Sequence, residues 1–290
     1  MALFRGNNIN QIYREMLLTV SQTGILEGKT RDLLSTQVVL TDPTFNLIGL
    51  DKNWRWCFQE LLDRMSGSVV SGFPSSRQNP GLAFIYRPAW KAKLAKEKGR
   101  FHYSYGDIYK DQVPAIIKQL KSTKTSREAI LNMWHGDYLL NQKTYNRRPC
   151  TLTIHFMVRE KKLHCWVNMR SNDIINLFPY DVFHHTMLQQ YIAARLGLGL
   201  GHYHHSSSHS YYPKKRERAG RRFLEKTIEK LGEFILDRDG NNSISFGEYK
   251  NSMRTDPELF DSELTGLMTL AYTRPMSLEA KQKITSSITS

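Results

Sequence analysis

The stretch TLTIHFMVREKKLHCWVNM, residues 151–169, contains the clearest strand pattern in the chain. Apolar and polar residues alternate through TLTIHFMV (151–158) and again through LHCWVNM (163–169), as they do in strands that bury one face. The charged segment REKK, at 159–162, has the composition of a turn. We therefore predict a β-hairpin over this stretch.

Outside the hairpin, both helices and strands are predicted. Apolar residues at helical spacing predict three helices, at 9–20, 53–65 and 181–195. The third is expected to end at the glycines that follow it, Gly197, Gly199 and Gly201. A short strand is predicted at 37–40. Helices and strands that alternate along one chain indicate an α/β or α+β fold.

The composition is that of a soluble globular protein, with 40% apolar and 23% charged residues among 290. We expect one catalytic domain over residues 1–250 and a C-terminal tail of undefined packing at 251–290. The formal charge of +14 indicates an anionic partner, which charge alone does not identify as nucleic acid, nucleotide or polyanionic cofactor. A solvated basic surface accounts for most of the Lys and Arg residues.

The cysteines disfavour a disulfide framework, because there are three of them without CxxC spacing. We expect a reducing cytoplasm, and we place Cys57 and Cys165 in the core because they lie within apolar patterns. The N-terminus has no apolar run of the signal-peptide kind. No stretch approaches the roughly 18 apolar residues of a membrane span, so no membrane association is expected.

Cys150, in NRRPC just before the hairpin, is the candidate nucleophile. A cysteine reacts as its thiolate, and nearby cations favour that form. Arg147 and Arg148 are adjacent in sequence, and Arg170 is expected to approach from the next strand. A buried structural cysteine is the alternative.

Two other segments carry donors for a nucleotide. In MRSND, at 169–173, an Arg and a Ser suit a phosphate, although a capped loop after the strand would have the same sequence. HYHHSSSHSYY, at 202–212, is rich in histidine, but no Cys or carboxylate lies nearby in sequence. We therefore favour a His-Tyr pair that contacts a sugar hydroxyl over a metal site.

DRDGNNSISFGE, at 237–248, is similar to a calcium-binding EF-hand loop. The matching ligand positions are 1, 3, 5, 7 and 12, occupied by Asp237, Asp239, Asn241, Ser243 and Glu248. Asn242 replaces the usual glycine at position 6, and the sequence has no second loop. We therefore predict no metal, with calcium at this loop as the alternative.

Six segments, in this order, resemble the thymidylate synthase superfamily. They are FQELL (58–62), YGDIY (105–109), TSREAILNMW (125–134), RRPC (147–150), MRSNDIINLFPYD (169–181) and HSY (209–211). The resemblance implies a large twisted sheet with surrounding helices, and a homodimer with the sheet at its interface. It also implies a nucleotide substrate and 5,10-methylenetetrahydrofolate as the one-carbon cosubstrate.

The resemblance also implies residue roles. Cys150 aligns with the nucleophile that adds to pyrimidine C6, Glu60 with a glutamate that organises water and proton transfer, and Asp181 with the base-reading position. The residues implied in nucleotide binding are Arg170 and Ser171 at the phosphate, Arg127 at the same phosphate from across the dimer, His209 and Tyr211 at the sugar, Tyr105 near the cysteine, and Asn172. The residues implied in folate binding are Asp173 and Trp90.

Some residues depart from the usual synthase pattern. Arg127 is followed by Glu128 where the family has two arginines, and PCT replaces PCH at the nucleophile. The base-reading asparagine is replaced by Asp181. This replacement, and NMRSND at 168–173, resemble the deoxycytidylate hydroxymethylases of T-even bacteriophages. A viral source would place the protein in the host cytoplasm.

An aspartate at this position has a chemical meaning. Cytosine offers a donor at N4 and an acceptor at N3, and a singly protonated carboxyl matches both. Against uracil, an ionised Asp181 would face the lone pairs of O4. The structural alternative is that Asp181 is the N-cap of a helix that starts at Val182.

The predicted function is therefore deoxycytidylate 5-hydroxymethyltransferase, acting on dCMP and folate. The resemblance implies that Cys150 adds to C6, that C5 takes the one-carbon unit and that water completes the product. The alternatives are a dCMP methylase or thymidylate synthase that uses hydride, and an inactive basic relative that binds nucleic acid. We consider nucleic acid the less favoured partner.

Overall fold

The computed structural model describes three long stretches of the chain and seven further residues. The described residues are 1–44, 46, 48, 57, 60, 61, 64, 65, 105–140 and 148–213. Trp90, the calcium-like loop at 237–248 and the predicted tail at 251–290 lie outside these residues.

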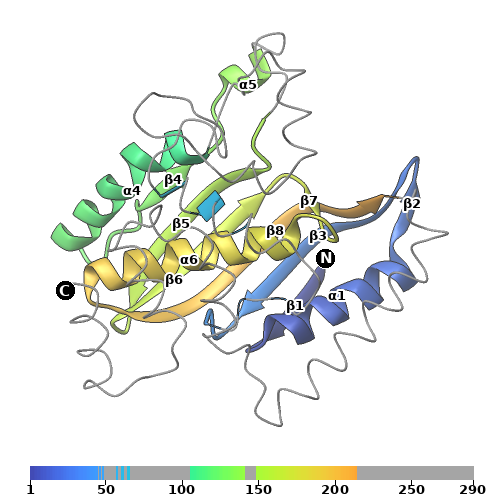
Figure 1. Cartoon of the computed structure of the whole chain (residues 1–290), viewed down its shortest axis with the longest axis horizontal. Coiled ribbons are helices and arrows are strands. Elements are labelled where there is room, and N and C mark those ends of the chain that lie inside the picture. The colour runs from blue at the N-terminus through green and yellow to red at the C-terminus, as the bar shows by residue number, and fades with distance from the viewer. Residues whose placement is uncertain are drawn as a thin grey trace, which may run out of the picture.

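A sheet of eight strands runs through the described part of the chain (Figure 1). The strands are β1 (Ala2–Gly6), β2 (Ile25–Glu27), β3 (Thr30–Leu40), β4 (Ile130–Asn132), β5 (Thr151–Arg159), β6 (Lys162–Met169), β7 (Asn172–Asp173) and β8 (Gly199–Pro213). The main order is β1-β3-β8-β6-β5-β4, with β2 paired to β3 and β7 to β8. The pairs β1–β3, β6–β8 and β7–β8 are parallel, and the others are antiparallel.

The predicted hairpin is confirmed as β5 and β6, which pair in register with Phe156 opposite Cys165. The turn residues Glu160 and Lys161 have φ of 51° and 58°, as in the two-residue turns that match strand twist. One face of the hairpin is buried, through residues that include Ile154, Phe156, Leu163, Cys165 and Val167. The alternation in the sequence therefore marked a half-buried pair of strands.

Helices α1 (Ile9–Thr23), α4 (Tyr105–Ser122) and α6 (Phe178–Leu196) pack on the sheet, and α5 (Asp137–Leu140) is a short turn of helix (Figure 1). Helix α1 contacts β1 and β3, α6 contacts β6 and β8, and α4 contacts α6 and β4. Asn8 caps α1 by accepting from the backbone N–H of Asn10 at 2.9 Å. Cys57 and Cys165 are fully buried, as predicted.

The structure corrects several boundaries. Helix α6 begins at Phe178, so Asp181 lies in its first turn and is not its N-cap. Only Gly197 ends the helix, with a left-handed φ of 64°, whereas Gly199 and Gly201 belong to β8. The strand predicted at 37–40 is the end of the longer β3, whose start is too polar to show alternation. None of the described helices is both long and apolar enough to cross a membrane.

Candidate active site

The hairpin brings Cys150 and Arg170 together. Cys150 directly precedes β5 and Arg170 directly follows β6, and the backbone N–H of Arg170 donates to the Cys150 carbonyl at 2.9 Å. The Arg170 guanidinium lies with Nη2 3.7 Å from Cys150 Sγ. It also donates to the carbonyls of Pro149 and Arg148, at 3.0 and 3.3 Å. The predicted approach of Arg170 to the cysteine is confirmed.

The charge state of Cys150 differs from the expectation. Burial raises the pKa of the thiol, Arg170 lowers it, and Asp181 and Asp173 raise it further. Arg170 favours the thiolate, as predicted, but the net pKa of the Cys150 thiol is above its ordinary value. Desolvation and two carboxyl groups outweigh one guanidinium. The thiol must therefore lose its proton when the substrate arrives.

Alkylation of Cys150 provides a test of this balance. We expect its rate with iodoacetamide to be low at pH 7 and to rise with pH beyond the range of an ordinary thiol, since only the thiolate reacts. Arg170→Gln removes the cation that lowers the pKa, so it should slow the reaction at pH 8. Peptide mass spectrometry measures both rates, with the buried Cys57 and Cys165 as internal controls. A Cys150 that is alkylated rapidly and independently of pH from 6 to 9 would contradict the raised pKa.

Asp181 is a carboxyl group that binds a proton near neutral pH. Its Oδ2 accepts a 3.0 Å hydrogen bond from Nδ2 of Asn172 in β7. Burial raises its pKa to about 7, although Arg64 and the Asn172 amide lower it and Glu60 raises it. The Asn172 amide also contacts His205 Nε2 at 3.3 Å, so it is fixed from a second side. Asp181 is therefore a well-oriented group that can both donate and accept.

A buried ion pair lies beside this carboxyl. Glu60 and Arg64 have helical backbone and bury nearly all of their surface, with Arg64 Nη2 2.5 Å from Glu60 Oε1. The Arg64 guanidinium lies 4.2 Å from the centroid of the Tyr105 ring. The Tyr105 hydroxyl is 3.1 Å from Thr151 Oγ1, next to the cysteine in sequence. The Glu60–Arg64 pair is thus connected through Tyr105 to the residue that follows Cys150, and the role implied for Glu60 stays a prediction.

Glu60 keeps one oxygen available. Its Oε2 is buried without a hydrogen-bond partner among the described residues, as are Arg64 Nη1 and Asn172 Oδ1. Buried polar atoms are nearly always paired, so such a group of atoms indicates a place for water or a ligand. This arrangement is what a residue that organises water would require.

We expect Arg64→Met to reduce the free energy of unfolding by about 3–5 kcal/mol, because it leaves the Glu60 carboxylate buried without its partner. Urea denaturation measures the loss. The matched control is Glu60→Gln combined with Arg64→Met, which removes both charges and should recover most of the stability. A loss below about 1 kcal/mol in the single variant, the size of an exposed pair, would show that the two charges are not coupled as described.

His209, Ser171 and Tyr211 form a second polar group, which connects β8 to the end of β6. Ser171 Oγ lies 3.3 Å from His209 Nδ1, and His209 Nε2 lies 3.1 Å from Asp32 Oδ2 in β3. The His209 and Tyr211 rings are stacked, with centroids 5.1 Å apart. Burial raises the pKa of Tyr211, as do Asp173 and Cys150, which lie close to it. The His-Tyr pair predicted at the sugar is thus adjacent to the serine predicted at the phosphate.

Asp173 has a structural role within the site. Its Oδ1 accepts from the backbone N–H groups of Ile175 and Asn176, at 3.1 and 2.9 Å, and its Oδ2 accepts from the Asn176 side chain at 2.7 Å. A carboxylate oxygen with one such donor retains a lone pair. Asp173 therefore retains an acceptor position for one further N–H donor. Arg127 is exposed, outside this buried cluster.

Sequence reasoning missed Arg64 and Asp32. Arg64 stands four residues after Glu60 in a helix pattern, and this spacing was a usable signal for an ion pair. Asp32 reaches the site only because β3 pairs with β8, where Asp32 is opposite Tyr211. Nothing local in the sequence around Asp32 indicates that pairing.

Comparisons with known proteins agree with the site. The family model for thymidylate synthase matches residues 52–254, so the chain belongs to the thymidylate synthase family. A putative thymidylate synthase of Methanocaldococcus jannaschii is 33% identical over 115 residues, which are 39% of this chain and 52% of that protein. A thymidylate synthase of Listeria monocytogenes is 22% identical over 186 residues, which are 64% of this chain and 55% of that protein. The chain spans about half the length of these two relatives.

A solved structure supports the fold. The thermostable thymidylate synthase A from Bacillus subtilis matches with a TM-score of 0.62 and 22% identity, over 77% of this chain and 84% of that chain. The predicted fold, a large sheet with surrounding helices, and the predicted family are confirmed. The relation to the hydroxymethylase branch stays a prediction.

Proposed function

We propose that this protein is a folate-dependent deoxycytidylate 5-hydroxymethyltransferase, in which Cys150 is the nucleophile and Asp181 selects cytosine. The observation that carries the choice of base is the Asp181 carboxyl, which Asn172 orients and whose pKa burial raises to about 7. A group of this kind can accept from cytosine N4 while it donates to N3. An ionised carboxylate against uracil would face O4 with no donor between them.

The nucleotide is held by groups that lie around the cysteine. Arg170 and Ser171 supply charge and donors for the phosphate, and the exposed Arg170 guanidinium is accessible to it. His209 and Tyr211 would bond the sugar hydroxyl, with His209 oriented by Asp32. Arg127 is proposed to reach the phosphate of a partner subunit in a homodimer formed through the sheet.

The chemistry begins at Cys150. As its Sγ bonds to C6, the proton that Asp181 places at N3 withdraws electrons from the ring, which assists the addition. C5 takes the one-carbon unit of methylenetetrahydrofolate and gives up its proton, and tetrahydrofolate then leaves, so that an exocyclic methylene remains on the bound ring; Asp173 is proposed to hold the pterin. Water adds to this methylene to give the hydroxymethyl group, and Glu60, with its unpaired oxygen, would orient that water. Release of Sγ from C6 then restores the aromatic ring and the free thiol.

Product analysis tests this proposal. The protein is incubated with methylenetetrahydrofolate and either dCMP or dUMP, and the nucleotides are resolved by mass while dihydrofolate is followed by absorbance. We expect 5-hydroxymethyl-dCMP without dihydrofolate, because water and not hydride completes the reaction. Methyl-dCMP with dihydrofolate would overturn the hydroxymethyl product, and turnover of dUMP alone would overturn the role of Asp181.

Thymidylate synthase is the second candidate, because the relatives that match this chain carry that name. It requires that Asp181 accept uracil despite its carboxyl group. Absence of turnover with both nucleotides, together with salt-sensitive binding to random DNA, would favour a basic nucleic-acid-binding relative instead.

A further inference from the structure

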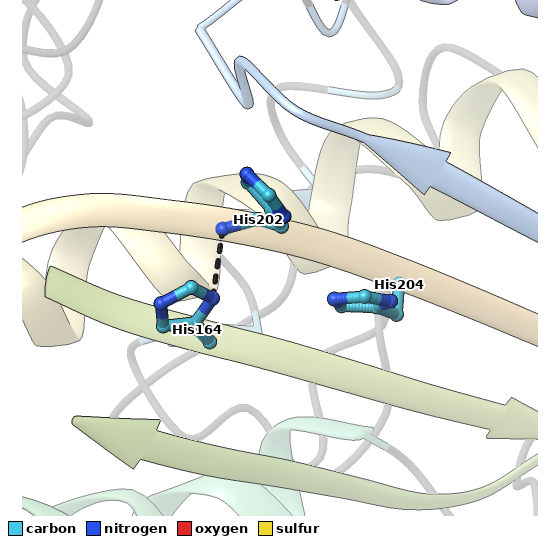
Figure 2. A group of neighbouring side chains, drawn as sticks. All are labelled: His164, His202 and His204. Atoms are coloured by element: carbon cyan, nitrogen blue, oxygen red, sulfur yellow. Dashed lines mark hydrogen bonds between the residues drawn. The ribbon is translucent and has the colours of Figure 1, made fainter. Parts of the chain in front are cut away.

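Three histidines lie together on the face of the sheet opposite α6. His202 and His204 are two residues apart on β8, so the pleat directs both side chains to one face. His164 is on the neighbouring strand β6, whose pairing with β8 shifts register between Leu163 and Cys165. All three are half-buried, and Figure 2 shows their rings arranged around one common space.

The donor atoms are close enough to share one ion. One ring nitrogen from each histidine lies within 4.8 Å of the other two, the one group of three potential ligands this close within the described ranges. Two histidines at alternate positions of a strand, with a third from the adjacent strand, can present three imidazole nitrogens to one tetrahedral ion. Three-histidine sites with a fourth position for water are an established class of zinc site.

The local structure favours the required form of the ligands. Burial lowers the pKa of His204 to about 4, with further lowering by His202, His164 and Arg5. Burial also lowers the pKa of His164, and His202 and Lys162 add to the effect. Metal binding needs neutral imidazoles, so these two rings are ready at pH 7.

His164 is fixed in place by its neighbours. Its Nδ1 accepts a 3.1 Å hydrogen bond from the backbone N–H of His202, so that nitrogen carries a lone pair on the side of the cluster (Figure 2). A Cβ at Gly201 would lie 2.5 Å from its ring atoms Cγ and Cδ2, so the ring occupies space that only a glycine leaves. The Trp166 ring stacks on His204, with centroids 4.7 Å apart. These contacts hold the rings without occupying the common space.

We propose that His164, His202 and His204 bind one divalent transition-metal ion of the zinc class, on the face of the sheet through which the homodimer is proposed to form. Imidazole is a ligand that suits Zn²⁺, Co²⁺ and Ni²⁺ far better than Ca²⁺ or Mg²⁺. Binding requires a small rotation of His164, by which Nδ1 exchanges the amide for the ion. The ion crosslinks β6 and β8 and takes no part in the reaction at Cys150.

The nearby charges set the strength of the site. Lys162 and Arg159 lie close enough to His164 to lower its pKa, and Arg5 lies close enough to His204 to do the same. The carboxyl group of Glu160 has the opposite effect on His164. Excess positive charge lowers the affinity for a cation. We therefore expect a site weaker than the cysteine-rich structural zinc sites.

The test is calorimetric titration of the full metal-free protein with ZnCl₂ at pH 7.5, in a non-chelating buffer. We expect saturable binding that includes one site lost in His202→Ala and in His204→Ala, each weakening that site at least about 100-fold, beyond the roughly 10–100-fold loss when only a supporting residue changes. Gly201→Ala should also weaken it, because the methyl group displaces the His164 ring. His155→Ala, which removes another half-buried histidine of the sheet, should leave it unchanged.

Cobalt provides a readout that loose surface binding does not give. Co²⁺ bound by three imidazoles in a four-coordinate, tetrahedral site shows intense visible d–d bands, without the charge-transfer band of a thiolate ligand. We expect these bands with the wild type and with His155→Ala, and their loss with His204→Ala. Zinc binding that is equal in the wild type and in the His202 and His204 variants, or the absence of tetrahedral cobalt bands, would overturn the proposal. Neither result depends on which nucleotide the protein converts.

Discussion

Cys150→Ser is expected to lower turnover by about 10⁴-fold or more while the variant still binds dCMP, because a serine hydroxyl beside Arg170 has no base to activate it. Turnover is measured as product by mass, and binding by calorimetry. The nucleotide contacts proposed for Arg170, Ser171 and His209 do not involve the sulfur atom, so the dissociation constant should change only slightly.

The control is Cys165→Ala, which removes a fully buried thiol from the core side of the hairpin. It should cost stability and leave the specific activity of the folded protein close to that of the wild type. If Cys150→Ser retained a tenth of the activity, or Cys165→Ala abolished it in folded protein, the nucleophile would have to be reassigned.

Asp181→Asn should change the preferred base. In the wild type, Asn172 donates to Oδ2 of Asp181. In the variant that bond holds the amide oxygen in the same place, which puts the NH₂ group where Oδ1 was. If the Oδ1 position faces position 4 of the ring, the NH₂ group that replaces Oδ1 can donate to O4 of uracil. The same NH₂ group would face the donor at N4 of cytosine. We expect the ratio of kcat/KM for dCMP over dUMP to fall by about 10⁴-fold, as when a site rejects a base that leaves buried polar groups unpaired.

Asn172 supplies the control for this prediction. Adding Asn172→Ala to Asp181→Asn frees the amide to rotate, so discrimination between the two bases should largely disappear. A variant that still prefers dCMP with Asn172 intact would show that Asp181 does not read position 4 of the base.

The same carboxyl fixes the pH dependence. The pKa of Asp181 is raised from 3.8 to about 7, so the proton needed at N3 is present below pH 7 and is lost as pH rises through that value. We expect kcat/KM for dCMP to fall on that alkaline side, and this fall to be absent for dUMP with Asp181→Asn. Cys150 must instead lose its proton to react, so its reactivity rises with pH. The two groups together should give the wild type a bell-shaped dependence of kcat/KM on pH.

The sequence alone predicts the part of the site that is formed by the hairpin. The alternation in 151–169 predicted the hairpin, and the hairpin by itself places Arg170 beside Cys150. The resemblance to the thymidylate synthases, carried by the ordered motifs, implied the roles of Glu60, Tyr105 and His209, and these roles stay predictions.

Two features required the folded molecule. The charge of Cys150 depends on how deeply the thiol is buried and on carboxyl groups from β7 and α6, which together outweigh the lowering of its pKa by Arg170. In the sequence, the histidines of β8 form a cluster without a nearby carboxylate, and this pattern disfavours a metal site. The third ligand candidate, His164, comes from a strand that a helix separates from β8 in sequence, and only the sheet places it there.

The pairing of β3 with β8 joins the N-terminal strands to the last described strand of the sheet. Asp32 meets Tyr211 across more than half of the chain, and β1 depends on β3 for its own pairing. Contacts between such distant segments are made late and slowly, because the loop between them must close first. During synthesis the hairpin that carries Cys150 can form before β8 has emerged, whereas the sugar-binding side of the site cannot. The nascent protein therefore has its nucleophile before it has a place for the nucleotide.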